Sequence, residues 1–277
     1  MPEADGGRVR EIAPGTFAIS DLVDLREPVS WAAPGTAAFD PSTCYLVLAR
    51  ADALLIDTGL RAHGAAIGDR LAALLPAGTR LWLTMTRVEP DALGNVDVLA
   101  ERFRFAGISS QTNVIPLDYI GPLSGRYPDV AITNGLLPGD RVPFGERELL
   151  VVEPAVRTLP TLWYYDQVTR TLFTSDFFGG AFVEESDAWT PSPAPDIAAT
   201  RAHLLAKFDW LAIADTSSAV ARLRGVRDGF EIDVIAPGHG LWTVGRKAVE
   251  HRIEVTLAAL ESLGTRARSL PVVEVTS

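Results

Sequence analysis

Charged side chains recur at alternate positions in the loop that follows an apolar stretch at residues 79–86. Arg87, Glu89 and Asp91 stand two residues apart in this loop. Carboxylates at such places are typical of metal-binding loops, in which histidines usually supply further ligands. Arginine has no lone pair for a metal and stays protonated at any biological pH. The loop therefore has the spacing of a metal site and one residue of the wrong chemistry.

Three other segments also carry polar residues directly after an expected strand. They are IDTG at 56–59, TSDFFGG with Asp176, and IAPGHG with His239. Sites in α/β proteins form where strands end. We therefore expect Glu89 and Asp91 to meet Asp176 and His239 in one pocket.

The residue counts limit the kind of site that the chain can build. Of the four histidines, His63, His203 and His251 lie in helical patterns and are interpreted as surface or half-buried residues, so an imidazole-rich site is not expected. The single cysteine, Cys44, excludes an internal disulfide and a thiol-rich metal site.

Composition narrows the class of protein. The 277 residues are 47% hydrophobic and 22% charged, an ordinary globular balance. No run of 18 apolar residues occurs, so we expect no membrane span, and the absence of an apolar N-terminal stretch predicts a cytoplasmic protein. The net charge of −10 disfavours binding to nucleic acid or anionic membranes. No nucleotide-binding glycine motif is present.

Hydrophobic patterns predict paired strands that alternate with helices in both halves of the chain. Strands are expected within 44–59, 79–86, 112–118, 147–155, 161–176 and 231–240, and helices within 61–75, 95–103, 197–225 and 247–264. The segments 118–140 and 189–196 are expected to be loops. This order predicts an α/β protein, a four-layer αββα sandwich that forms one domain over residues 1–277.

The ordered motifs resemble the metallo-β-lactamase fold, and within it the diiron domain of the flavodiiron proteins. The metal loop of that family, H-x-E-x-D-H-x-G-N, matches residues 87–95, and its F-S-x-D-x-F-G segment matches residues 173–179. The last ligand lies in I-A-P-x-H-G, matched by 235–240, and the mid-chain P-x-x-H-W-P is matched by 154–159. The resemblance covers roughly residues 10 to 262.

Departures from the family pattern fall on the metal ligands. The resemblance implies one iron position at Arg87, Glu89, Arg157 and Asp176, where two arginines replace histidines. It implies a second position at Asp91, Asp176 and His239, where Ala92 replaces a further histidine. Two like charges 4 Å apart repel by about 4 kcal/mol even at an effective dielectric of 20, so the first position is expected to hold no metal.

A salt-bridge cluster could replace the metal centre. Arg87 and Arg157 can each form forked hydrogen bonds to the carboxylates of Glu89, Asp91 and Asp176. On this hypothesis Arg157→Ala destabilises the protein by roughly 3–5 kcal/mol. The second position, with Asp91, Asp176 and His239, could still hold at most one iron, manganese or zinc ion.

Three functions remain open from the sequence. In the first, the protein is metal-free and its pocket, with the guanidinium groups of Arg87 and Arg157, binds a small polar or anionic ligand, or supports acid–base chemistry through Glu89 or His239. In the second, a mononuclear metal enzyme acts as an oxidoreductase or a hydrolase. In the third, it is a structural or assembly protein, and the resemblance further implies a homodimer. Since the sequence ends at Ser277, before any flavodoxin domain, it implies an external flavoprotein or reductase as electron donor.

Overall fold

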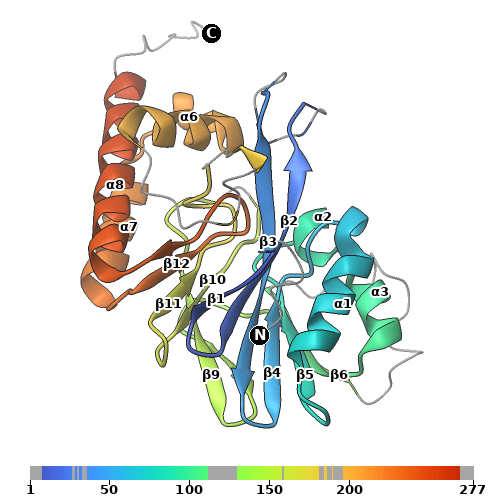
Figure 1. The fold of residues 1–277 in the computed structure, drawn as a ribbon. Helices are drawn as coiled ribbons and strands as arrows, with labels where there is room; N and C mark the ends of the chain where they lie inside the picture. Colours follow the sequence, from blue (N-terminus) through green and yellow to red (C-terminus); the bar gives the residue numbers. More distant parts are fainter. Residues whose placement is uncertain are drawn as a thin grey trace, which may run out of the picture.

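Two β-sheets lie face to face with helices on their outer faces, as Figure 1 shows. This computed structural model describes residues 8–26, 29, 31, 32, 36–111, 130–157, 159–180, 184, 185, 189 and 196–268. The expected αββα sandwich is confirmed. Its four layers are helices, the first sheet, the second sheet and helices again.

The first sheet has seven strands in sequence order. They are β1 (Val9–Ala13), β2 (Thr16–Asp24), β3 (Phe39–Ala49), β4 (Asp52–Ile56), β5 (Arg80–Thr84), β6 (Phe105–Ser109) and β7 (Ala131–Thr133). Neighbours from β1 to β4 are antiparallel, and those from β4 to β7 are parallel. The 3-10 helix η1 (Arg61–His63) and helices α1 (Gly64–Leu74), α2 (Pro90–Leu93) and α3 (Val96–Arg102) belong to this half.

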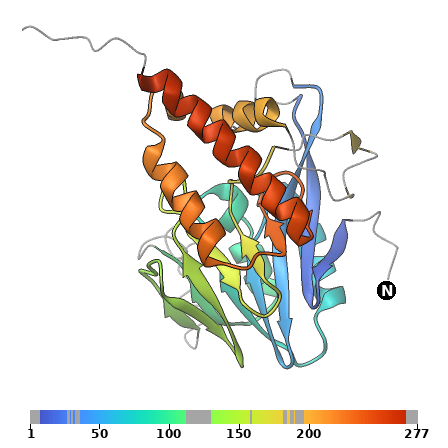
Figure 2. The ribbon, with the colours of Figure 1, turned by 90° about the vertical axis from the view of Figure 1, so that its left-hand side faces the viewer.

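The second sheet has six strands in the order β13-β12-β11-β10-β9-β8. Their bounds are β8 (Arg141–Phe144), β9 (Arg147–Val152), β10 (Trp163–Asp166), β11 (Thr171–Phe173), β12 (Val234–Ala236) and β13 (Thr243–Val244). Its outer face is covered by α6 (Ile197–Lys207), the 3-10 helix η3 (Asp209–Ala212), α7 (Ser217–Gly229) and α8 (Arg246–Arg268). Figure 2 shows α7 and α8 side by side on this face.

The alternation of side chains along β4 explains the layering. Successive residues of a strand face opposite sides of its sheet. Ala53 and Leu55 pack with α1 and α3, whereas Leu54 and Ile56 pack against Tyr164 and other residues of the second sheet. All four are fully buried. An apolar strand covered on both faces is what a four-layer sandwich requires.

The structure contradicts one local expectation and does not describe the residues of two others. The segment 118–140, expected to be a loop, contains β7, whose residues are exposed and pair with β6 at the sheet edge. A three-residue edge strand carries too few apolar residues for its pattern to be recognised. The expected strand 112–118 and most of the expected loop 189–196 lie outside the described residues.

The helices offer no candidate for a membrane span. Throughout the described segments, none of them combines the length and the apolar character that crossing a bilayer requires.

Candidate functional site

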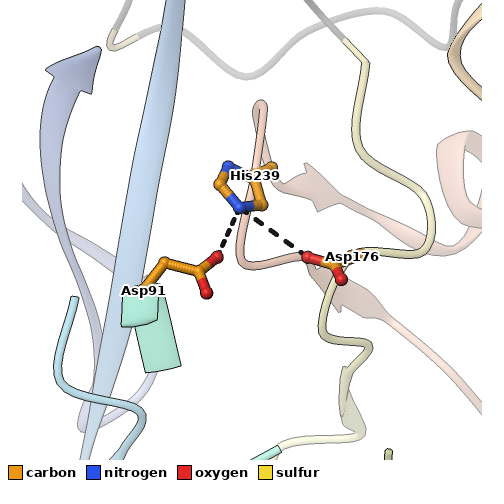
Figure 3. Close-up of side chains that lie close together, drawn as sticks. All are labelled: Asp91, Asp176 and His239. Atoms are coloured by element: carbon orange, nitrogen blue, oxygen red, sulfur yellow. Dashed lines mark hydrogen bonds and ion pairs between the residues drawn. The ribbon is translucent and has the colours of Figure 1, made fainter. Parts of the chain in front are cut away.

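Polar side chains gather where β4, β5, β11 and β12 end. In Figure 3 His239 lies between Asp91 and Asp176, and dashed lines join it to both carboxylates. Asp91 belongs to the single turn of α2, Asp176 follows β11, and His239 follows β12. His239 Nε2 is 2.6 Å from Asp91 Oδ2 and 3.7 Å from Asp176 Oδ1. The loops expected to converge therefore do so.

The Arg87 side chain lies at the centre of this group and is only 2% exposed. Its Nε donates to Glu89 Oε2 at 2.6 Å, and its Nη2 donates to the Asp91 carboxylate. The same Nη2 lies 2.8 Å from Asp176 Oδ1 and 3.4 Å from His239 Nε2. One guanidinium thus contacts all three acids that the sequence motifs single out.

The backbone of the Arg87 loop is fixed by partners on both sheets. Asp57, at the end of β4, accepts hydrogen bonds from the Thr86 backbone N–H at 2.7 Å and from the Thr86 hydroxyl at 2.8 Å. The Tyr164 hydroxyl, on β10, donates to the Met85 carbonyl at 2.9 Å. These contacts hold the backbone where β5 ends, and thereby the point from which the Arg87 side chain extends to the carboxylates.

Burial changes the pKa of the Asp57 carboxyl more than these hydrogen bonds do. Desolvation raises its pKa to about 7, although Arg87 and the Thr86 donors act in the opposite direction. The residue also has φ of +61°, a left-handed conformation that non-glycine residues rarely adopt. The IDTG aspartate is therefore a strained, buried support beneath the site.

His239 has a carboxylate at each ring nitrogen. Its Nδ1 is 2.9 Å from Asp40 Oδ2, and its Nε2 faces Asp91. Burial lowers the pKa of this imidazole, but Asp40 and Asp91 outweigh that effect and raise it to about 10. The other Asp40 oxygen accepts from the Gly240 N–H at 2.8 Å, so Asp40 also fixes the backbone beside the histidine.

A lysine that the sequence motifs did not indicate supplies a second cation. Lys207, the last residue of α6, has its Nζ 3.2 Å from Asp176 Oδ2 and 3.6 Å from Glu89 Oε2. The same Nζ lies 5.7 Å from the ring centre of Trp31. Trp31 in turn stacks 4.6 Å from the His239 ring and donates to Asp40. Lys207 is 11% exposed, so it closes the cluster toward solvent.

The expectation that Arg157 joins the cluster is wrong. Its side chain is exposed, and none of the ion pairs found among the described residues involves it. Arg157 comes shortly after β9, and its side chain is exposed although residues 154–156 before it are buried. The position that Arg157 was expected to fill beside Asp176 is filled by Lys207.

The charges of the cluster nearly balance. The carboxylates of Asp40, Glu89, Asp91 and Asp176 face the cations of Arg87, Lys207 and protonated His239. Burial raises the pKa of Asp91, but Arg87 and His239 outweigh it and hold that pKa well below its usual range. For Arg87, burial opposes the charge and the surrounding acids, Asp176 first, raise the pKa further.

The loop that carries Asp176 is held in an unusual conformation. Ser175 and Phe178 have φ of +56° and +64°. Ser175 accepts a hydrogen bond from Arg87 Nη1 at 2.8 Å, and the buried Arg252 of α8 donates to the carbonyls of Phe178 and Gly179. Backbone strain of this kind persists only where the surroundings enforce it. Here both arginines enforce it.

Three side chains have the spacing of metal ligands. One ligand atom each from Asp91, Asp176 and His239 lies within 4.8 Å of the others. Protein ligands hold such ions at roughly 2.0–2.2 Å. Arg87 Nη2 contacts the same three atoms, so an ion between them would compete with a cationic nitrogen for one space. The donor set with its arginine therefore does not fit a diiron centre.

The site thus contains most of the residues expected from the motifs and three that were not. Arg87, Glu89, Asp91, Asp176 and His239 are brought together, while Arg157 is not. The additional residues are Asp40, Lys207 and Trp31. Asp40 is the one charged residue in the strand 39–49, and a charge in a buried strand needs a partner, so this was a usable signal.

Comparisons with known proteins fit this architecture. No family model matches the sequence. Diflavin flavoprotein A 1 of Thermosynechococcus vestitus is 27% identical over 195 residues, which cover 67% of this chain and 31% of that protein. The chain thus spans less than a third of the length of this curated relative.

Solved structures of flavodiiron cores superpose on most of the chain. The metal-soaked Flv1 flavodiiron core from Synechocystis sp. PCC6803 has a TM-score of 0.70 at 17% identity, covering 91% of this chain and 60% of its own. The Giardia intestinalis flavodiiron protein has a TM-score of 0.70 at 16% identity, covering 95% and 60%. Fragment 1–254 of diflavin flavoprotein A 5 from Nostoc sp. PCC 7120 has a TM-score of 0.68 at 17% identity, covering 94% and 97%. The chain has the metallo-β-lactamase fold of these cores.

Proposed function

We propose that this protein is a flavodiiron-type core in which the side chains of Arg87 and Lys207 take the place of metal ions. On this proposal the protein binds no iron and does not itself reduce oxygen or nitric oxide. The observation that carries the proposal is the position of Arg87 Nη2, which contacts Asp91, lies 2.8 Å from Asp176 and lies 3.4 Å from His239. A cation that the chain itself supplies at this point makes a bound ion unnecessary for neutralising the acids.

The metal-free site is proposed to bind a small polar molecule at its rim. Glu89 is 29% exposed and Lys207 is 11% exposed, whereas His239 and Arg87 are buried. All three guanidinium nitrogens of Arg87 already contact protein acceptors, so they are not available to an anion. A ligand that contacts both the Glu89 carboxylate and the Lys207 ammonium group is therefore favoured over a simple anion. Any acid–base chemistry would use Glu89, the most exposed of these groups.

A second candidate function rests on the spacing of Asp91, Asp176 and His239. Their ligand atoms lie within 4.8 Å of one another, so a rotation of Arg87 would leave a set suited to one iron, manganese or zinc ion. Such an ion would polarise a bound water or substrate, as a mononuclear oxidoreductase or hydrolase requires. This candidate predicts one ion per chain in the isolated protein.

Metal analysis separates the two candidates. Protein purified without chelator is analysed for iron, manganese and zinc, before and after addition of each metal and its removal by gel filtration. The first proposal predicts far less than one ion per chain in both samples, and no oxygen uptake with a reduced flavin donor. One ion per chain together with a metal-dependent activity would establish the second candidate instead. Arg87→His, which restores a ligand of the family motif beside the carboxylates, is expected to retain metal. Arg157→His also restores a motif histidine, but at an exposed position, and is expected to retain none, which makes it the matched control.

Partners are proposed from the relatives alone. The name of the Thermosynechococcus protein describes a diflavin flavoprotein, which suggests a flavoprotein or another reductase as a partner of this chain. A homodimer is proposed from the resemblance to the flavodiiron family. Sedimentation of the purified chain alone, and then with a flavodoxin, tests both, because each association predicts a distinct mass.

A further inference from the structure

A cavity lies on the helical face of the molecule, away from the charged cluster. It has a volume of about 640 Å³ and is formed where α7 ends and α8 begins, the two helices that run side by side in Figure 2. The segment 230–232, which leads into β12, closes one side. His239 follows the other end of β12, so this cavity and the cluster share no residue. Its volume is within the range of small-molecule sites.

The floor of the cavity is apolar and well supported. Ile232, Val249 and Ile253 are at most 5% exposed and belong to the core between the second sheet and its helices. Phe230 is half-buried beside them, and its ring packs edge-to-face on Tyr165 with the ring centres 4.9 Å apart. An apolar floor of this kind can hold a hydrocarbon body, because binding removes the apolar surfaces of both from water.

The rim of the cavity carries more acids than bases. Four acids line it, Asp228, Glu231, Glu250 and Glu254, against two arginines, Arg227 and Arg246. All six side chains lie on α7, on α8 or on the short connection before β12.

Both arginines are already engaged by acids. Arg227 donates to Asp228 and to Glu254, each at 2.8 Å. Arg246 donates to Asp233 at 3.1 Å and lies 3.5 Å from Glu231. These pairs leave the arginines little capacity to bind an anion.

Glu250 supplies negative charge that is not neutralised in this way. It is exposed, and no base pairs with it within the described part of the chain. The C-terminal end of α7 at Gly229 and the N-terminal end of α8 at Arg246 both border the cavity, so their helix dipoles oppose each other there. The excess of acids over bases in the lining is what favours a cation.

We propose that this cavity binds a small organic cation, an ammonium group on an apolar body, with the body on Phe230, Val249 and Ile253 and the charge beside Glu250. The Phe230 ring face can add a cation–π contribution. A neutral apolar molecule would gain only the apolar contacts with the floor, and an anion would be repelled by the unpaired carboxylate of Glu250. The volume of about 640 Å³ favours a small molecule over an extended basic peptide, which would need a longer groove.

The test uses 2-phenylethylammonium as the probe and 2-phenylethanol as its neutral isostere, in calorimetric titrations of the full chain. The proposal predicts binding of the ammonium and at least about tenfold weaker binding of the alcohol, since the alcohol lacks the charge. Glu250→Lys is expected to weaken the ammonium about tenfold or more. Glu146→Lys, an exposed acid between β8 and β9 outside the cavity, is the matched control and leaves the affinity unchanged.

Three results would overturn the proposal. They are equal binding of the ammonium and the alcohol, an ammonium affinity that Glu250→Lys and Glu146→Lys alter alike, and no ammonium binding at millimolar concentration. If the third result is accompanied by binding of a lysine-rich peptide, it indicates a protein partner instead. Circular dichroism of both variants establishes that they are folded, so that a lost affinity is assigned to charge.

Discussion

Removal of the Arg87 side chain is the most direct perturbation of the charged cluster. In Arg87→Ala the carboxylates of Glu89, Asp91 and Asp176 lose a partner that is 2% exposed and contacts all three. Loss of one member of a buried ion pair costs roughly 3–5 kcal/mol, because the remaining charge stays buried. Glu89 can turn toward solvent, so we expect the lower part of this range. The melting temperature should fall by roughly 10 °C.

The same variant should acquire affinity for divalent metal. Without the guanidinium, the ligand atoms of Asp91, Asp176 and His239 face an open space. A divalent ion at 100 times its dissociation constant would restore about 2.7 kcal/mol. Thermal and urea unfolding with and without Zn²⁺ measure both effects. Zn²⁺ is expected to raise the melting temperature of Arg87→Ala and not that of the unmodified protein. Arg87→Lys, which keeps the charge but loses the fork, should be intermediate.

Arg157→Ala is the control for this experiment. Its side chain is exposed, so its removal should change stability by no more than about 0.5 kcal/mol. Equal costs for Arg87→Ala and Arg157→Ala would refute the assignment of Arg87 as the central cation. An unchanged melting temperature in Arg87→Ala would refute the cluster itself.

Three further predictions concern the neighbours of Arg87. Lys207→Met should destabilise the protein by about 1–2 kcal/mol in urea unfolding, and the exposed Lys247→Met should have little effect. Because the pKa of His239 is raised from 6.5 to about 10, its contribution to stability is complete below pH 6.5 and is lost as pH rises toward 10. Melting temperatures should therefore fall between pH 7 and 10, and His239→Gln should flatten that fall; parallel curves would contradict it. Asp40→Asn removes one carboxylate from His239, so NMR titration should show a lower pKa for this histidine, and an unchanged pKa would exclude the ion pair.

The alternation of paired strands with helices predicted the layers, and the ordered motifs predicted most of the cluster. The apolar run at 53–56 is buried on both faces, which a sandwich of two sheets explains, and the strand ends carry the site residues as expected. The short edge strand β7 has no such pattern and was expected to be loop.

The errors at the site have one physical cause. Arg157 matches a ligand position of the family motif, but the next two residues, 158 and 159, differ from those of the motif. A matching position in the sequence does not by itself determine where a side chain points. Lys207 is the converse case. It stands at the end of α6, where the sequence pattern is that of a solvated surface lysine. Only the packing of α6 on the rest of the protein brings its Nζ to Asp176. Tertiary packing, which local patterns do not encode, decided both.

The contact between Asp40 and His239 joins residues 199 positions apart in the chain. Through Arg87, Asp176 and Lys207 the same group also fastens the ends of β5, β11 and α6. No one of these segments can open alone without breaking a charged contact that is largely shielded from water. Backbone amides at this end of the sandwich should therefore exchange their hydrogens together, in events that expose several segments at once, although loops usually exchange early and independently.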